Sequence, residues 1–189
     1  EATDITRTEA TLHGQASPLD NGSLPELEFL IGTGGKMAAA RQPLTLGADN
    51  VTTRLDSLTP GTAYSYCLKA FDGHNNTYSD TMTFVTLPNN KPSVTQPKLY
   101  SQGPTSMIAS YSVTDNGGEP LTATGFCVTN TATGGQRRIE ADGDINADTT
   151  FTLHISGLQQ NTEYEIRAYA ANTVGESQGP ELEITTGNA

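Results

Sequence analysis

Four oxygen-bearing side chains lie at every second position of one acidic stretch, DGDINADTT, which runs from Asp142 to Thr150. They are Asp142, Asp144, Asn146 and Asp148. Calcium-binding loops present carboxylate and amide oxygens in this alternating way, on one side of a curved backbone. The helical calcium-hand template does not fit, because Leu153 stands where that template needs a bidentate Glu. The stretch is a candidate calcium site, and the alternative interpretation is a solvated acidic turn between two strands.

The residue types that usually catalyse reactions do not form a recognisable set. The three histidines, His13, His74 and His154, have no nucleophile and acid beside them in a known pattern, and no Gly-x-Ser-x-Gly elbow occurs. Glu26 and Glu28 share one face of a predicted strand, where paired acids are more typical of a solvated surface than of a glycosidase. The sequence therefore predicts neither an enzyme nor a bound cofactor.

The two cysteines, Cys67 and Cys127, fall in different halves of the chain. A disulfide within one half is therefore impossible, and the sequence predicts two free thiols. A zinc site is also disfavoured, because the cysteines are far apart and no two histidines have the spacing of zinc ligands.

The strongest pattern is an internal repeat with a period of 100 residues, between Leu58–Phe71 and Leu158–Ala171. Matching positions carry the same residue types, namely Leu58, Thr62, Tyr64 and Ala70 in the first copy and Leu158, Thr162, Tyr164 and Ala170 in the second. From each tyrosine onward, mostly apolar and more polar residues alternate, which is the period of a strand with one buried face. Each copy is predicted to be a turn that leads into a strand.

A tyrosine at the start of a strand, just after a Leu-x-x-x-Thr turn, resembles the tyrosine corner of immunoglobulin-like sandwiches, where the hydroxyl bonds to upstream backbone. The set Leu58, Pro60, Thr62, Tyr64 and Ala70 resembles the signature of fibronectin type III domains. The segments YEIRAYAAN and GFCV resemble repeats on surface proteins of Gram-negative gut anaerobes. The resemblance implies an all-β fold of two tandem fibronectin type III-like sandwiches, with about seven strands each. This fold hosts many unrelated tasks.

The domain boundary is expected at LPNNKP, which has two prolines and no strand periodicity. We predict a first domain over residues 1–88, a short Pro-containing linker over 89–92 and a second domain over 93–189. A chain of 189 residues is long enough for two small cores, in which Phe and Tyr provide the aromatic anchors because Trp is absent.

The chain is acidic, with a net charge of −11 from 21 acidic and 10 basic residues. Nucleic acids and anionic membrane surfaces would be repelled, so neither is an expected partner. No apolar run is long enough to span a membrane, and no signal peptide is visible ahead of the polar start at Glu1. An extracellular or cell-surface location is implied by the resemblance alone.

The resemblance implies a non-enzymatic extracellular module for adhesion, display or spacing, whose partner is a protein or a cell-surface glycan. The alternative is an accessory carbohydrate-binding component of a polysaccharide-uptake or glycosidase system. Such a component needs exposed aromatic side chains, for which the candidates are Phe71, Tyr78, Tyr100 and Tyr169. The expected contact loops are 72–78 and 172–179, which follow the two tyrosine strands.

The resemblance also implies O-glycosylation, because secreted proteins of those bacteria are modified at Asp followed by Ser or Thr and then a small or aliphatic residue. Ser57, Thr81 and Thr149 match this pattern. Ser57 and Thr149 are expected to be exposed enough for a bulky glycan, whereas Thr81 begins a predicted strand and is expected to be hindered.

Overall fold

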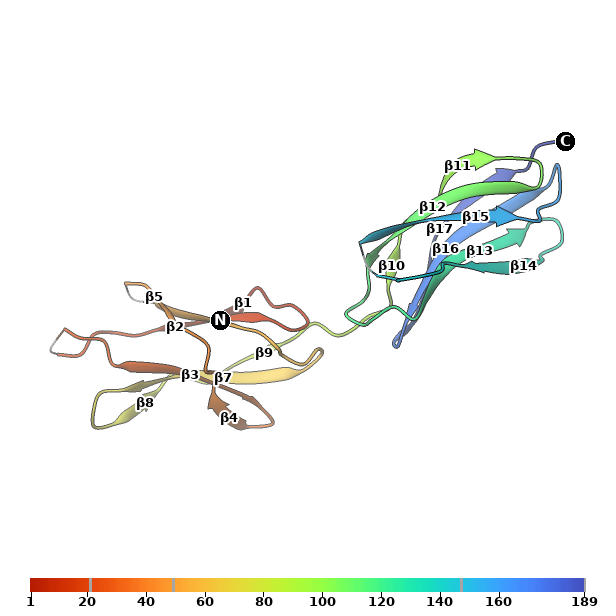
Figure 1. Ribbon diagram of the computed structural model, residues 1–189. Coiled ribbons are helices and arrows are strands. Elements are labelled where there is room, and N and C mark those ends of the chain that lie inside the picture. The colour runs from red at the N-terminus through yellow and green to blue at the C-terminus, as the bar shows by residue number, and fades with distance from the viewer. Residues whose placement is uncertain (21, 49, 147, 189) are drawn as a thin grey trace. The chain divides into compact units, whose positions relative to one another are not determined.

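The computed structural model describes residues 1–20, 22–48, 50–146 and 148–188, and all regular structure in them is β-strand. The chain divides into two compact units, Glu1–Pro88 and Asn89–Ala189. Each unit consists of two antiparallel sheets that enclose a core, as the ribbons in Figure 1 show. The predicted all-β sandwich fold is confirmed.

Unit 1 contains two sheets, with the strand orders β1-β2-β6-β5 and β4-β3-β7-β8, and β9 pairs with β7 beyond the end of β8. The strands are β1 (Ala2–Thr3), β2 (Ala10–Gln15), β3 (Glu26–Thr33), β4 (Lys36–Ala39), β5 (Thr45–Leu46), β6 (Asn50–Leu55), β7 (Ala63–Phe71), β8 (Asn76–Tyr78) and β9 (Met82–Val85).

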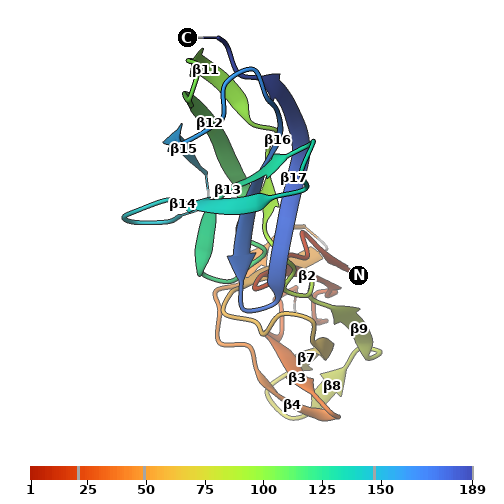
Figure 2. The same cartoon turned by 90° about the vertical axis from the view of Figure 1, so that its right-hand side faces the viewer.

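Unit 2 repeats this plan, with one sheet in the order β14-β13-β16-β17 and another in which β10, β11 and β15 all pair with β12. Figure 2 shows these sheets from the side. The strands are β10 (Ser93–Val94), β11 (Lys98–Gln102), β12 (Ser106–Asp115), β13 (Ala123–Asn130), β14 (Gln136–Glu140), β15 (Thr149–Ser156), β16 (Glu163–Asn172) and β17 (Gly175–Thr185).

The predicted alternation along the tyrosine strands accounts for the two cores. In β16, the inward-facing side chains are at most 6% exposed; they are Tyr164, Ile166, Ala168 and Ala170. In β7, Tyr66 and Leu68 are buried in the same way, whereas Tyr64 is half-buried and stacks on Phe84 with 5.5 Å between ring centroids. Burial of these faces supplies the main driving force for each unit, because apolar area is removed from water there.

Both cysteines are free, as predicted, but Cys67 is buried although the alternation places it on the outer face. Burial raises the pKa of the Cys67 thiol. The alternation was a poor guide here because the outer face of a central strand is covered by the side chains of its neighbours. In unit 2, Cys127 lies directly between Arg138 and Arg167 on the adjacent strands.

A tyrosine corner is present in both units and includes a threonine that the sequence did not indicate. The backbone N–H of Thr59 donates to the hydroxyl of Tyr64, and that of Gln159 donates to the hydroxyl of Tyr164, each at 2.9 Å. A buried threonine near the end of the last strand closes the same turn from the other side. Thr86 donates to the carbonyl of Thr59, and Thr186 to that of Gln159, both at 2.6 Å.

The loops after the tyrosine strands are shorter than predicted, and the first edge of unit 2 is a broken strand. At the start of unit 2, the chain forms two short strands, β10 and β11, because Pro97 lies between them and has no N–H to donate. The predicted loop 172–179 is mostly strand, since β16 continues to Asn172 and β17 begins at Gly175. Three residues of the other predicted loop form β8.

We expect Tyr164→Phe to lower the free energy of unfolding of unit 2 by about 0.5–1.5 kcal/mol, because the Gln159 N–H loses its acceptor. Urea unfolding of the whole chain, followed through NMR signals of unit 2, measures the change. Tyr100→Phe removes a hydroxyl from the same unit at a 69% exposed side chain and serves as the control. Equal urea midpoints for the two variants would contradict a stabilising corner.

Candidate functional site

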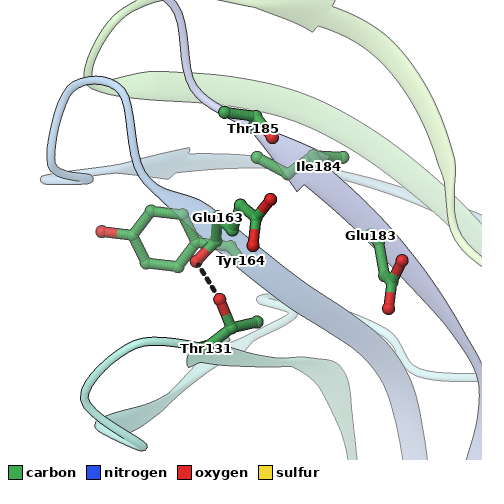
Figure 3. A pocket seen from close by; sticks show the side chains of 6 residues that line it. All are labelled: Thr131, Glu163, Tyr164, Glu183, Ile184 and Thr185. Carbon is green, nitrogen blue, oxygen red and sulfur yellow. Dashed lines mark hydrogen bonds between the residues drawn. The ribbon is translucent and has the colours of Figure 1, made fainter.

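A polar hollow of about 310 Å³ lies in unit 2 where β16 begins and β17 ends. It is lined by Thr131, Glu163, Tyr164, Glu183, Ile184 and Thr185 (Figure 3). The Thr131 hydroxyl donates to the backbone oxygen of Glu163 at 3.2 Å, which is the dashed line in Figure 3. The hydroxyl is therefore engaged in holding the β13–β14 turn against β16.

The described lining of this hollow includes two carboxylates, those of Glu163 and Glu183. Among the residues that the structure describes, neither is paired with a basic side chain. The lining residues that the structure describes include no histidine, cysteine, lysine or arginine. The arrangement therefore offers carboxylate oxygens to a polar ligand but no nucleophile held by a base.

On the outer face of the β14-β13-β16-β17 sheet, Tyr169, Arg138 and Glu176 form one contact group. The ring lies opposite Gly125 in the β13–β16 pairing, and the guanidinium of Arg138 lies 4.6 Å from its centroid. Arg138 in turn holds both carboxylate oxygens of Glu176 at 2.7 Å. Tyr169 is only 1% exposed as a result, although the sequence placed it outward as a possible sugar-contacting aromatic.

The contacts within this group shift the pKa values of Glu176 and Tyr169. The hydrogen bonds from Arg138 hold the pKa of Glu176 below its ordinary value. Burial, together with the nearby carboxylate of Glu140, raises the pKa of the Tyr169 hydroxyl. The group is held together by charge-assisted hydrogen bonds and a cation–π contact, so it serves to cover the sheet.

The other three aromatic candidates are divided between the two units. Tyr100 is 69% exposed on β11 in unit 2, whereas Tyr78 is 55% exposed on β8 in unit 1. Phe71, at the end of β7, is half-buried. Of the four aromatic candidates, Tyr100 in unit 2 is thus the most exposed to solvent.

An open groove of about 680 Å³ lies in unit 1 between the two sheets. Its floor is apolar and comes from β3 and β7, through Phe29, Tyr66 and Leu68. One wall is the end of β2, and the other is the segment 79–82 between β8 and β9. Its volume lies within the range of ~300–1,000 Å³ that is usual for binding clefts. No feature of the sequence indicated it.

The two hairpins that follow the tyrosine strands are capped alike. The Asp72 carboxylate accepts from the N–H groups of His74 and Asn75, both at 2.7 Å, and these bonds lower its pKa. The Asn172 side-chain oxygen accepts from Val174 and Gly175 at 2.9 and 3.1 Å. These turns were predicted as contact loops, and the caps make them ordered.

Asn172 has a second role that a carboxylate could not perform. Its amide nitrogen donates to the carbonyl of Asn90 at 2.7 Å and to that of Asn116 at 2.8 Å. The N–H of Asn90 donates to the carbonyl of Gly117. A side chain at Gly117 would meet the oxygen of Asn90 at 1.9 Å, so glycine is required there. The residues assigned to a linker, 89–92, are therefore fastened to unit 2.

The candidate calcium ligands Asp142, Asp144, Asn146 and Asp148 are all exposed. Position 147, which lies among them, is outside the described residues. In the part of the chain that the structure describes, no group of three His, Cys, Asp or Glu side chains is close enough to hold a metal ion. Calcium binding by this stretch stays a prediction.

The candidate glycosylation residues differ in exposure from what the sequence suggested. Ser57 is exposed, as expected. Thr81 is also exposed, because it lies in the break between β8 and β9 and not within a strand, whereas Thr149 is half-buried at the start of β15. The expectation that Thr149 is more exposed than Thr81 was wrong. O-glycosylation itself stays a prediction.

The histidines and the paired acids are not brought together. His13 contacts the Thr3 hydroxyl at 2.8 Å, His74 lies in a hairpin turn and His154 is exposed on β15. Glu28 forms a 3.3 Å ion pair with Lys69 on the neighbouring strand, and Glu26 is exposed.

The described residues contain no helix of the length and apolarity needed to cross a membrane.

Comparison with protein families identifies the sandwich. The Fibronectin type III domain family matches residues 91–187, which is just over half of the chain. The chain belongs to the fibronectin type III family. Domains of this family are generally non-catalytic modules, and the tyrosine corner seen in both units is a feature of immunoglobulin-like sandwiches.

A curated relative is endoglucanase B of Cellulomonas fimi, to which the chain is 32% identical over 165 residues. The alignment covers 85% of this chain, which spans only 15% of the length of that protein. Among solved structures, a crystal structure of the chicken CNTN1 FN1-FN3 domains matches with 15% identity and a TM-score of 0.41. That match covers 99% of this chain and 64% of the other chain.

We expect Asn172→Ala to lower the free energy of unfolding of this fibronectin type III unit by about 1–3 kcal/mol, because two carbonyls lose their donor. Asn172→Asp is the matched control, since a carboxylate keeps the turn cap, as Asp72 does in unit 1, but cannot donate. Amide hydrogen exchange at Asn90 should become faster in both variants. Unchanged exchange at Asn90 would contradict the fastening role.

Proposed function

We propose that this chain is a non-catalytic fibronectin type III module of an extracellular protein, in which it spaces, displays or binds other components. The observation that carries the proposal is the alignment with endoglucanase B, where 85% of this chain corresponds to 15% of the enzyme. A shared segment that is so small a part of a long enzyme supports an accessory role for it.

The geometry of the described residues supports the same role. The polar hollow at the start of β16 offers the carboxylates of Glu163 and Glu183, and its described lining holds no histidine, cysteine, lysine or arginine beside them. On the outer face of the β14-β13-β16-β17 sheet, aromatic and charged side chains contact one another. Arg138, for example, contacts both Tyr169 and Glu176. Side chains committed to internal contacts favour a rigid support for other components.

An extracellular setting is part of the proposal. An endoglucanase meets its polymeric substrate outside the cell, so an accessory segment that it shares with this chain would work there too. The partner is a protein or a glycan, because the net charge of −11 disfavours nucleic acids and anionic lipid surfaces.

We expect no release of reducing ends when the chain is incubated with a soluble β-glucan such as carboxymethyl cellulose. The physical reason is that the described lining of the polar hollow provides two carboxylates but no histidine, cysteine or lysine beside them. A double variant, Glu163→Gln with Glu183→Gln, is the control. Activity that this variant loses would locate catalysis at the hollow and overturn the non-catalytic role.

A second candidate function, glycan binding, is favoured by one exposed surface on unit 2. The ladder between β11 and β12 has an irregularity between Leu99 and Ser101, which leaves Tyr100 without a partner and 69% exposed. Ile108, the partner of Ser101, is 36% exposed, and it pairs with the exposed His154 on β15. An aromatic ring beside polar groups on a sheet can stack on a sugar ring.

If this surface binds glycan, the chain should be retarded in native gels that contain a soluble β-glucan, and Tyr100→Ala should abolish the retardation. The reason is that the exposed tyrosine ring provides the stacking face. Tyr78→Ala, which removes an exposed tyrosine from the other unit, is the matched control and should migrate like the unmodified chain. Normal mobility of the unmodified chain across a panel of β-glucans would reject this candidate.

A further inference from the structure

Lys98, the first residue of β11, is an exposed cation in an acidic protein. Four other basic side chains are each paired with a carboxylate, namely Arg54, Lys69, Arg138 and Arg167. Within residues 1–20, 22–48, 50–146 and 148–188, no such pair involves Lys98. In a chain with 21 acidic and 10 basic residues, its ammonium group is therefore available to an external anion.

The strand pairings place this cation next to the exposed tyrosine of β11. Lys98 lies opposite Ser110 on β12, and Ser101 lies opposite the exposed Ile108. Ser110 and Ile108 are two residues apart on one strand, so the two pairs form neighbouring rows on the same face, roughly 7 Å apart. Tyr100 lies between these rows along β11. This group, the Tyr100 surface, consists of Lys98, Tyr100, Ser101 and Ile108.

The irregularity in β11 adds hydrogen-bonding groups beside the tyrosine ring. Leu99 pairs with Ala109 and Ser101 pairs with Ile108, so the ladder gives Tyr100 no opposite residue. A residue that is extra in a ladder has an N–H and a carbonyl that the partner strand does not engage, and its side chain is re-aimed. The backbone of Tyr100 and the hydroxyl of the exposed Ser101 can therefore pair with hydroxyl groups of a ligand.

The strands around Lys98 carry little negative charge. Within the described residues of β10, β11, β12 and β15, the acidic side chain is that of Asp115. It lies five residues beyond Ser110 on β12, which is roughly 17 Å along the strand. The glutamates of the strands of unit 2 belong to the other sheet. Packed sheets are about 10 Å apart and charges are screened over about 8 Å at physiological ionic strength, so the net charge of the whole chain does not decide what contacts this face.

An exposed ring, an unpaired cation and backbone groups outside the ladder together fit an acidic sugar. The ring of Tyr100 can stack on the C–H face of a pyranose, and the ammonium of Lys98 can pair with a carboxylate on that sugar. We propose that the Tyr100 surface binds the uronic-acid units of an acidic polysaccharide, and that Lys98 selects them over neutral sugar units. The proposal rests on the second candidate function above, glycan binding, and names the class of glycan.

The probes are two matched oligosaccharides, cellotetraose and the same tetramer with its C6 hydroxymethyl groups oxidised to carboxylates. Each is added to the whole 189-residue chain at physiological ionic strength, and backbone amide signals are followed by NMR. We expect saturable shifts at Tyr100 and Ser101 with both probes. The oxidised tetramer should bind about threefold more tightly, which is the size of effect that one exposed ion pair provides.

Two variants with the same change in net charge test whether Lys98 makes the selection. Lys98→Gln should weaken binding of the oxidised tetramer about threefold, to the level of cellotetraose, and should leave binding of cellotetraose unchanged. Lys36→Gln removes an exposed lysine from unit 1 and should change neither affinity. Equal weakening by both variants would show an effect of net charge alone and overturn the proposal.

The other outcomes separate failure of this proposal from failure of glycan binding. Equal affinities of the unmodified chain for the two tetramers, or a preference for the oxidised tetramer that persists in Lys98→Gln, would overturn selection by Lys98 and leave glycan binding in place. No shift at Tyr100 and Ser101 with either tetramer at millimolar concentration would overturn glycan binding at this surface, and the proposal with it. Shifts confined to unit 1 would do the same.

Discussion

The turn that carries the chain from one sheet of each sandwich to the other depends on two hydroxyl groups. A tyrosine hydroxyl accepts from the backbone five residues upstream, and a buried threonine from the last strand donates to the carbonyl of the same residue. In unit 2, Tyr164 and Thr186 thus satisfy the backbone N–H and the backbone carbonyl of Gln159. A turn that crosses the end of a sandwich would otherwise bury unpaired backbone, which costs more than an average hydrogen bond contributes.

With that turn fixed, the strand that follows it becomes the centre of one sheet, and its alternation decides what the core contains. The two units then fill their cores differently. Tyr111 of β12 packs on Phe126 and Phe151, and its hydroxyl contacts Thr124, while burial raises its pKa to about 12. Unit 1 has Gly14 at this position, where even a Cβ atom would meet Leu68 at 2.9 Å. The same architecture is thus filled by different side chains in the two units.

The surface chemistry follows from how polar groups are used internally. On unit 2, Arg138 covers Tyr169 and pairs with Glu176, and Arg167 pairs with Glu165 and Glu181. These contacts make a sheet face that is charged but already satisfied, which suits a support better than a catalytic surface. Tyr100 on β11, at the edge of the other sheet of this unit, is instead exposed to solvent. Function in such a module is expected at edges and not at a central cleft.

The sequence by itself determined the sandwich, because the spacing of Leu158, Thr162 and Tyr164 and the alternation after it reflect local geometry that any such strand must have. It also indicated that the cysteines are free and that no familiar catalytic set exists. Only the tertiary structure decided that Thr186 completes the corner, since its partners lie more than twenty positions away. The same holds for the burial of Tyr169 beneath Arg138 and for the fastening of Asn90 by Asn172. Each depends on which strands become neighbours, and the periodicity of one strand carries no information about what its neighbours place on it.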